Sequence, residues 1–125
     1  MLNSVKLLGK ITKEPKVIET KNGKQFVALE MSVRKPFKNH DGRYDKDYID
    51  IITWNNISSF LLNDMKKNDS ILVRGRVNTY TQEENGINIK KQNILASKIS
   101  LVSKNRSKEN EIPNEINQDN LELEK

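Results

Sequence analysis

The chain of 125 residues contains no cysteine, so disulfide bonds, thiolate metal centres and cysteine nucleophiles are all excluded. Its one histidine, His40, cannot form a multi-histidine metal site, and we expect it to lie in a loop. No apolar run is long enough to span a membrane, and residues 1–5 lack the apolar stretch of a signal peptide. These absences favour a cytoplasmic protein or, if a targeting segment has been removed, one of an organelle matrix.

Catalytic motifs are also missing. The sequence has no P-loop, no Gly-x-Gly spacing and no nucleophile placed beside a base. Asp45, Asp47 and Asp50 lack the spacing of an EF-hand, so loop and strand-end charges explain them better than metal ligands do. We therefore expect a protein that is not an enzyme and that needs no metal or cofactor.

Charge is distributed unevenly along the chain. Residues 1–108 carry 21 Lys/Arg against 11 Asp/Glu, a net of +10, whereas residues 109–125 carry one Lys against six acids, a net of −5. A basic body suits a polyanionic partner, and a detached acidic end suits an interaction tail. The length fits one domain. We expect this domain over residues 1–102 and a disordered acidic tail over residues 103–125, where no aromatic residue occurs.

The first half of the basic body alternates with period two, which is typical of β-strands. A strand is expected over residues 4–12, with Gly9 marking a bulge or a sharp barrel bend. Glu14-Pro15 then interrupts, and residues 16–20 continue extended. Asn22-Gly23 is a strong hairpin signal, and an alternating strand follows it through residues 27–33.

The second half predicts three more strands and one helix. Residues 35–46 are expected to form an exposed loop or a long hairpin tip, followed by strands over residues 47–54, 70–80 and 87–102. Between the first two of these strands the apolar residues recur at helical spacing (Ile57, Phe60, Leu61 and Met65), so we expect a short amphipathic helix there. Five strands with one helix between the third and fourth is the element order of an OB-fold, a small all-β barrel. Another small antiparallel barrel is the alternative.

Aromatic residues lie among Lys and Arg, which is the combination that single-strand binding requires: rings on which bases stack and cations that follow the phosphates. Tyr48 and Trp54 are six residues apart on one strand, hence on one face. Four residues of the next strand share a face: Arg74, Arg76, Asn78 and Tyr80. The expected loop carries Phe37 among four cations, and with Lys90 of the last strand these complete the candidate set: Arg34, Lys35, Phe37, Lys38, Arg43 and Lys90.

Alternation alone leaves other roles open. Trp54 and Tyr48 fit core packing as well as a binding face, and Arg74 and Arg76 fit an ordinary solvated face. Phe26 and Phe60 are assigned to packing, and Tyr44 is left without a role.

Several segments, in this order and spacing, resemble the bacterial-type single-stranded DNA-binding protein family. They are VKLLGKITKEP at residues 5–15, Asn22-Gly23, MSVRKPF at residues 31–37, DYIDIITW at residues 47–54 and Gly75-Arg76-Val77. The resemblance covers residues 1 to about 102. It implies an OB-fold, sequence-tolerant binding of single-stranded DNA in replication, recombination and repair, a nucleoid location and a homotetramer.

The resemblance also implies site residues. Tyr48 and Trp54 match the family's two stacking aromatics of the third strand, and Phe37 matches the one after the second strand. A fourth family aromatic falls on Gln82, and Tyr80, two residues earlier with the same parity, is the expected substitute. Asp50 departs from the pattern, because a carboxylate on this face repels phosphate unless it is paired, for example with an arginine of the fourth strand. Residues 119–125 (DNLELEK) lack the Pro-Phe tip through which family members recruit replication proteins, so recruitment by that route is not expected.

Two other functions remain as alternatives. An OB-fold module for RNA would use the same stacking and phosphate contacts. A structural subunit would use the barrel face for protein contacts.

Overall fold

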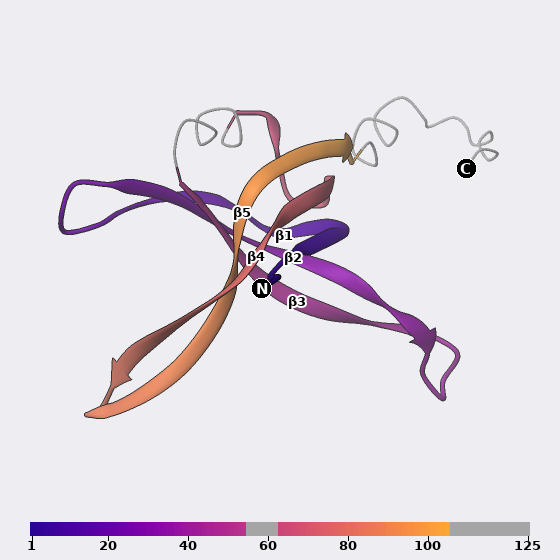
Figure 1. The fold of residues 1–125 in the computed structure, drawn as a ribbon. Coiled ribbons are helices and arrows are strands. Elements are labelled where there is room, and N and C mark those ends of the chain that lie inside the picture. The colour runs from indigo at the N-terminus through magenta and orange to yellow at the C-terminus, as the bar shows by residue number, and fades with distance from the viewer. Residues whose placement is uncertain (55–62, 106–125) are drawn as a thin grey trace.

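The computed structural model describes residues 1–54 and 63–105. Within them the chain forms five strands, drawn in Figure 1: β1 (Val5–Glu19), β2 (Gln25–Lys38), β3 (Tyr44–Trp54), β4 (Ser70–Glu84) and β5 (Ile87–Ser103). The all-β class with five strands is confirmed. The expected helix falls mainly on residues 55–62, outside the described residues, and stays a prediction.

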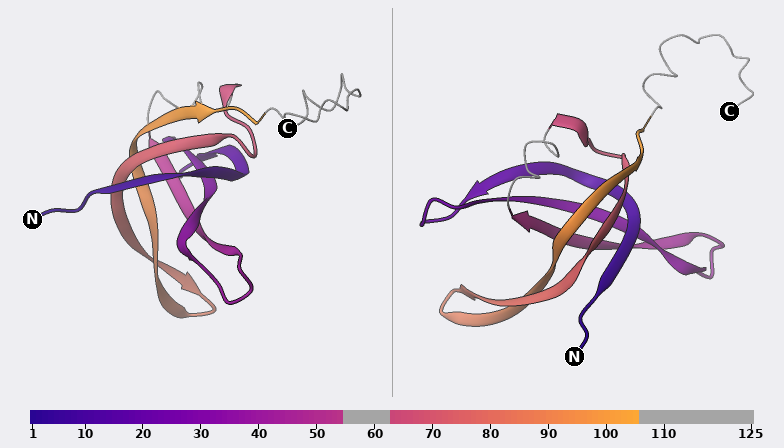
Figure 2. Two further views of the ribbon diagram at one scale, coloured as in Figure 1. Left: turned by 90° about the vertical axis from the view of Figure 1, so that its right-hand side faces the viewer. Right: turned by 45° about the horizontal axis from the view of Figure 1, so that its top comes forward.

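The strands close into a barrel in the order β1-β2-β3-β5-β4. All neighbouring pairs are antiparallel except β3 and β5, which join in parallel through Ile51↔Ile94 and Ile52↔Leu95. The hairpins of β2–β3 and β4–β5 extend beyond the barrel as two long arms (Figures 1 and 2). We call residues 34–48 the β2–β3 arm and residues 78–93 the β4–β5 arm.

β1 serves two neighbours and has to bend between them. It pairs with β4 from Val5 to Lys10 and with β2 from Lys10 to Glu19. Gly9 lies at this bend, where a Cβ atom would be 2.0 Å from the carbonyl oxygen of Ser32. Glycine is required there because two backbones approach more closely than any side chain allows.

One expectation about strand boundaries was wrong. Glu14-Pro15 does not interrupt β1. Pro15 lies in a β-bulge of the strand, where the register shifts between Ile11 and Lys16. A residue in a bulge is left out of the hydrogen-bonded ladder, so the N–H group that proline lacks is not needed there. Of the two alternatives for residues 35–46, the structure shows the long hairpin tip, since β2 continues to Lys38 and β3 already begins at Tyr44. Phe37 therefore lies on a strand.

The core is built from the inward residues of all five strands, together with Met65. Alternation in β2 and β3 places Val27, Leu29, Met31 and Ile51 inside, and all four are buried. The outward residues between them form the surface described below. The other buried apolar residues are Ile11, Met65, Ile71, Val73, Ile94, Ala96 and Ile99.

A buried carboxylate fixes the chain just beyond β5. Asp69 accepts hydrogen bonds from the backbone N–H groups of Lys66 (2.9 Å) and Asn105 (2.8 Å), and the ammonium of Lys104 lies 3.2 Å away. Burial by itself would raise the pKa of Asp69, but these donors outweigh burial and hold the pKa below its usual value.

Candidate nucleic-acid interface

The outward face of β3 carries a row of aromatic side chains. Ile51 and Thr53 point into the core, so the even-numbered residues of the strand point outward. Among them are Tyr44, Tyr48 and Trp54. Tyr48 is 63% exposed and stands opposite Ser32 of β2. Its ring is free to be covered by a flat partner.

Trp54 lies on this outer face and is not among the buried core residues. Its ring packs against that of Phe26, its cross-strand neighbour, with centroids 4.8 Å apart and planes tilted by 49°. Trp54 also lines a hollow of about 420 Å³ together with Arg76 and Leu95. Phe26 is thus a packing residue, as expected, but it packs on the outer face.

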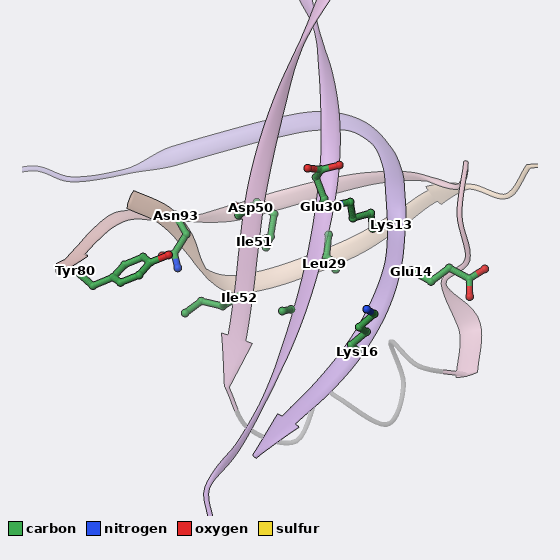
Figure 3. A pocket seen from close by; sticks show the side chains of 11 residues that line it. Lys13, Glu14, Lys16, Leu29, Glu30, Asp50, Ile51, Ile52, Tyr80 and Asn93 are labelled. Carbon is green, nitrogen blue, oxygen red and sulfur yellow. The ribbon is translucent and has the colours of Figure 1, made fainter. Parts of the chain in front are cut away.

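Tyr80 of β4 borders the same surface, although β5 lies between β4 and β3 in the barrel. It lines a hollow of about 270 Å³ with Asp50 and Ile52 of β3 and Asn93 of β5 (Figure 3). The contact arises because β5 closes the barrel against β3 and brings the β4–β5 arm alongside. Tyr80 therefore lies near the section of β3 between Tyr48 and Trp54.

Two lysines that the sequence argument missed line this central hollow. Lys13 and Lys16 of β1 lie opposite Glu30 and Ala28 of β2, on the outward face (Figure 3). Their spacing of three does not fit a regular strand, because the bulge around Pro15 shifts the alternation between them. Pro15 was the available signal, since a proline within a strand marks a bulge or an edge.

A pair of carboxylates lies at the centre of the face. Asp50 stands directly opposite Glu30, and Glu30 accepts a hydrogen bond of 2.7 Å from Thr12 Oγ1. The arginine of β4 suggested as one partner for Asp50 does not pair with it among the described residues. Among these residues the carboxylate of Asp50 has neither a side-chain hydrogen bond nor an ion pair, and Lys13 and Lys16 are the cations that line the hollow.

The β2–β3 arm carries most of the remaining candidates. Phe37 is 75% exposed, and Arg34 and Lys38 lie over the ring of Tyr44. Arg43 ends the turn at the tip, where its backbone N–H donates to Asn39 Oδ1. Arg34, Lys38 and Tyr44 thus form one basic and aromatic cluster on this arm.

Lys35 differs from the other cations of that arm. It alternates with Arg34 and forms an ion pair with Asp47 on the opposite face of the hairpin. The hydrogen bond and the charge of Asp47 raise the pKa of Lys35 above its ordinary value. Its charge is thus already balanced within the protein.

The two arginines of β4 lie in different surroundings. Arg76 borders the hollow beside Trp54. Arg74 stands between Lys6 of β1 and Lys98 of β5, its direct cross-strand partners. Three neighbouring cations repel one another, so this row is suited to an anionic partner.

Lys90 does not share the face of Tyr80. The cross-strand partner of Tyr80 is Lys91, whereas Lys90 pairs with Thr81 on the other side of the β4–β5 arm. Lys91 in turn forms an ion pair of 2.8 Å with Glu84. The structure therefore brings together Tyr48, Trp54, Tyr80 and Arg76, with the β2–β3 arm adjoining, and leaves Lys35 and Lys90 on other faces.

Residues 2–102 match the model of the single-strand binding protein family, that is, nearly all of the described barrel. The chain belongs to this family. Single-stranded DNA-binding proteins of Oceanobacillus iheyensis and Bacillus subtilis (protein A) are 35% and 34% identical to it, over 63% and 66% of the chain. The matches cover 49% and 48% of those two proteins, so the chain spans about half the length of these relatives.

The fold is similar to that of solved family members. The Plasmodium falciparum SSB in complex with ssDNA superimposes with a TM-score of 0.68 at 17% identity, covering 84% of this chain and 96% of that one. At such low identity the likeness concerns the fold, which is OB-fold-like. In the part of the chain that the structure describes, no helix is long and apolar enough to cross a membrane.

Proposed function

We propose that the chain binds single-stranded DNA without sequence preference and protects it in replication, recombination and repair. The observation that carries this proposal is the row of outward aromatic rings on β3, bordered by cations. Tyr48 and Trp54 offer flat surfaces to bases, and every base has a face that can stack. Family membership and the relatives named above support the same function.

Phosphate binding would come from cations at the rim of this face. Arg76 beside Trp54, the lysines of the central hollow and the basic β2–β3 arm follow the row of rings. Arginine and lysine contact phosphates without distinguishing one base from another. The carboxylates of Glu30 and Asp50 would exclude phosphate from the centre, so that a base edge lies there instead.

We also propose that the chain is a binding protein with no catalytic step, that it acts at the cytoplasmic nucleoid and that it assembles as a homotetramer. The family supports these expectations. We propose further that the folded domain includes residues 103–105, because β5 ends at Ser103 and Asp69 holds Lys104 and Asn105. The acidic tail would then begin beyond them.

Fluorescence of Trp54, the one tryptophan, tests the function directly. Titration with oligo-dT and with unrelated mixed sequences should quench it with similar affinities, and molar mass is measured in parallel. Competition with oligo-U of the same length, at the same salt concentration, tests the preference for DNA. The absence of binding at low salt would contradict the proposal, and tighter binding of oligo-U would turn it toward RNA.

A further inference from the structure

Tyr44, which the sequence left without a role, lies directly beneath a guanidinium group. The Cζ atom of Arg34 is 4.5 Å from the centroid of the Tyr44 ring, and Lys38 Nζ is 5.8 Å from it. Cations take such positions because the face of an aromatic ring is electronegative. Two cations of the basic arm are therefore gathered around one ring.

This ring belongs to the same outward face as the two stacking candidates of β3. Arg34 stands opposite Lys46, so Tyr44 is its diagonal neighbour on that face. Tyr44, Tyr48 and Trp54 are all even-numbered residues of β3, so their side chains point to the same side of the strand. At about 3.3 Å per residue, Tyr44 lies roughly 13 Å beyond Tyr48 along β3, in the direction away from Trp54.

The ring is both accessible and held in place. Tyr44 is 41% exposed, and its contacts with Arg34 and Lys38 fix its orientation. The hairpin beneath it is braced at the tip, where Asn39 Oδ1 accepts the backbone N–H groups of Asp41 and Arg43. A side chain that is ordered before binding loses less entropy when a ligand covers it.

We propose that Tyr44 is an additional base-stacking position, which extends the path of single-stranded DNA from Trp54 and Tyr48 onto the β2–β3 arm. A base stacks on the exposed part of the ring, and the charges of Arg34 and Lys38 lie close enough to meet its phosphate. This proposal rests on the proposed function, because it assigns one more contact to the same bound strand.

The main test is the affinity of Tyr44→Ala for an oligo-dT of about 20 nucleotides, a length beyond the site sizes of roughly 4–16 nucleotides found for single OB-folds. We expect a loss of about 5- to 150-fold, the range for one stacked base. Tyr44→Phe, which keeps the ring, should bind within about twofold of the wild type. Tyr44→Leu, which keeps apolar bulk without a ring, should lose as much as Tyr44→Ala, so a folding defect specific to alanine is controlled.

Salt dependence separates stacking from a role in merely positioning Arg34. Arg34→Ala should flatten the slope of log K against log salt by about 0.7 for one lost phosphate contact. Tyr44→Ala should shift that line downward without changing its slope. Unchanged affinity of Tyr44→Ala, or a slope as flat as that of Arg34→Ala, would overturn the proposal. Failure of the proposed function would be recognised separately, because DNA would then not quench Trp54 even in the wild type.

Discussion

The rings of Trp54 and Phe26 pack against each other across the β2–β3 pair, with their planes tilted by 49° and their centroids 4.8 Å apart on the outer surface of the barrel. This contact supports the indole from one side while Trp54 borders an open hollow with Arg76. Trp54 is therefore held in place by a neighbour outside the core, which is the arrangement expected of a stacking platform.

Replacing Trp54 tests that platform. Trp54→Ala should weaken ssDNA binding by about 1–3 kcal/mol, the range for one stacked base, whereas Trp54→Phe should retain most of the affinity. Fluorescence anisotropy of a labelled oligo-dT measures both variants, since neither retains the tryptophan. Phe26→Leu provides a further control, because loss of its ring should alter the emission of Trp54 in the free protein. Full affinity in a folded Trp54→Ala protein would assign the residue to packing alone.

Cations on different faces should differ in their contribution to the salt dependence. Arg76→Ala, Arg74→Ala and Lys38→Ala should each weaken binding to all sequences alike and reduce the slope of log K against log salt by about 0.7. Lys35→Ala is the matched control on the same arm. It should have a smaller effect, because Asp47 already balances the charge of Lys35. An effect of Lys35→Ala as large as that of Lys38→Ala would show that DNA follows the other side of the hairpin.

Because of Asp69, the stability of the folded domain should decrease at acidic pH. Its pKa is lowered in the folded protein, so its contribution is complete above the unfolded value of about 3.9 and is lost as the pH falls through the folded value. At neutral pH, Asp69→Asn should lower the free energy of unfolding by about 1.5–3 kcal/mol, the range for hydrogen bonds to a charged group. Urea unfolding of both proteins between pH 7 and pH 2 measures the difference. The two stability curves should converge at the acid end, and a constant gap would contradict this account.

Residues 109–125, with six acids and one lysine, should compete weakly with DNA for the basic surface. A tethered segment acts at high effective concentration, so a chain ending after Lys108 should bind ssDNA equally well or slightly more tightly, with any gain fading at high salt. Its melting temperature and its number of subunits, obtained from the molar mass, should match those of the full chain. A lower melting temperature would show that the tail packs on the domain, and markedly weaker binding would show that it contacts DNA.

How much of the candidate site could be predicted follows from strand alternation. Tyr48 and Trp54 were placed on one face because β3 is regular over the six residues that separate them. Lys13 and Lys16 were missed because β1 is bulged at Pro15, and alternation cannot be counted across a bulge. Lys35 was included because it flanks Phe37 in the sequence, where its ion pair with Asp47 could not be foreseen.

The sequence by itself determined the five strands, their turns and the inward set of apolar residues, because these depend on local periodicity and on residues such as Asn22-Gly23 and Asn85-Gly86. Only the tertiary structure decided that Trp54 lies outside the core, that Tyr80 lines one hollow with Asp50 and Ile52, and that Arg34 covers Tyr44. The physical reason is that these contacts join residues on different strands. Their neighbours are set by barrel closure and by the register of each pair, and neither is encoded in the periodicity of a single strand.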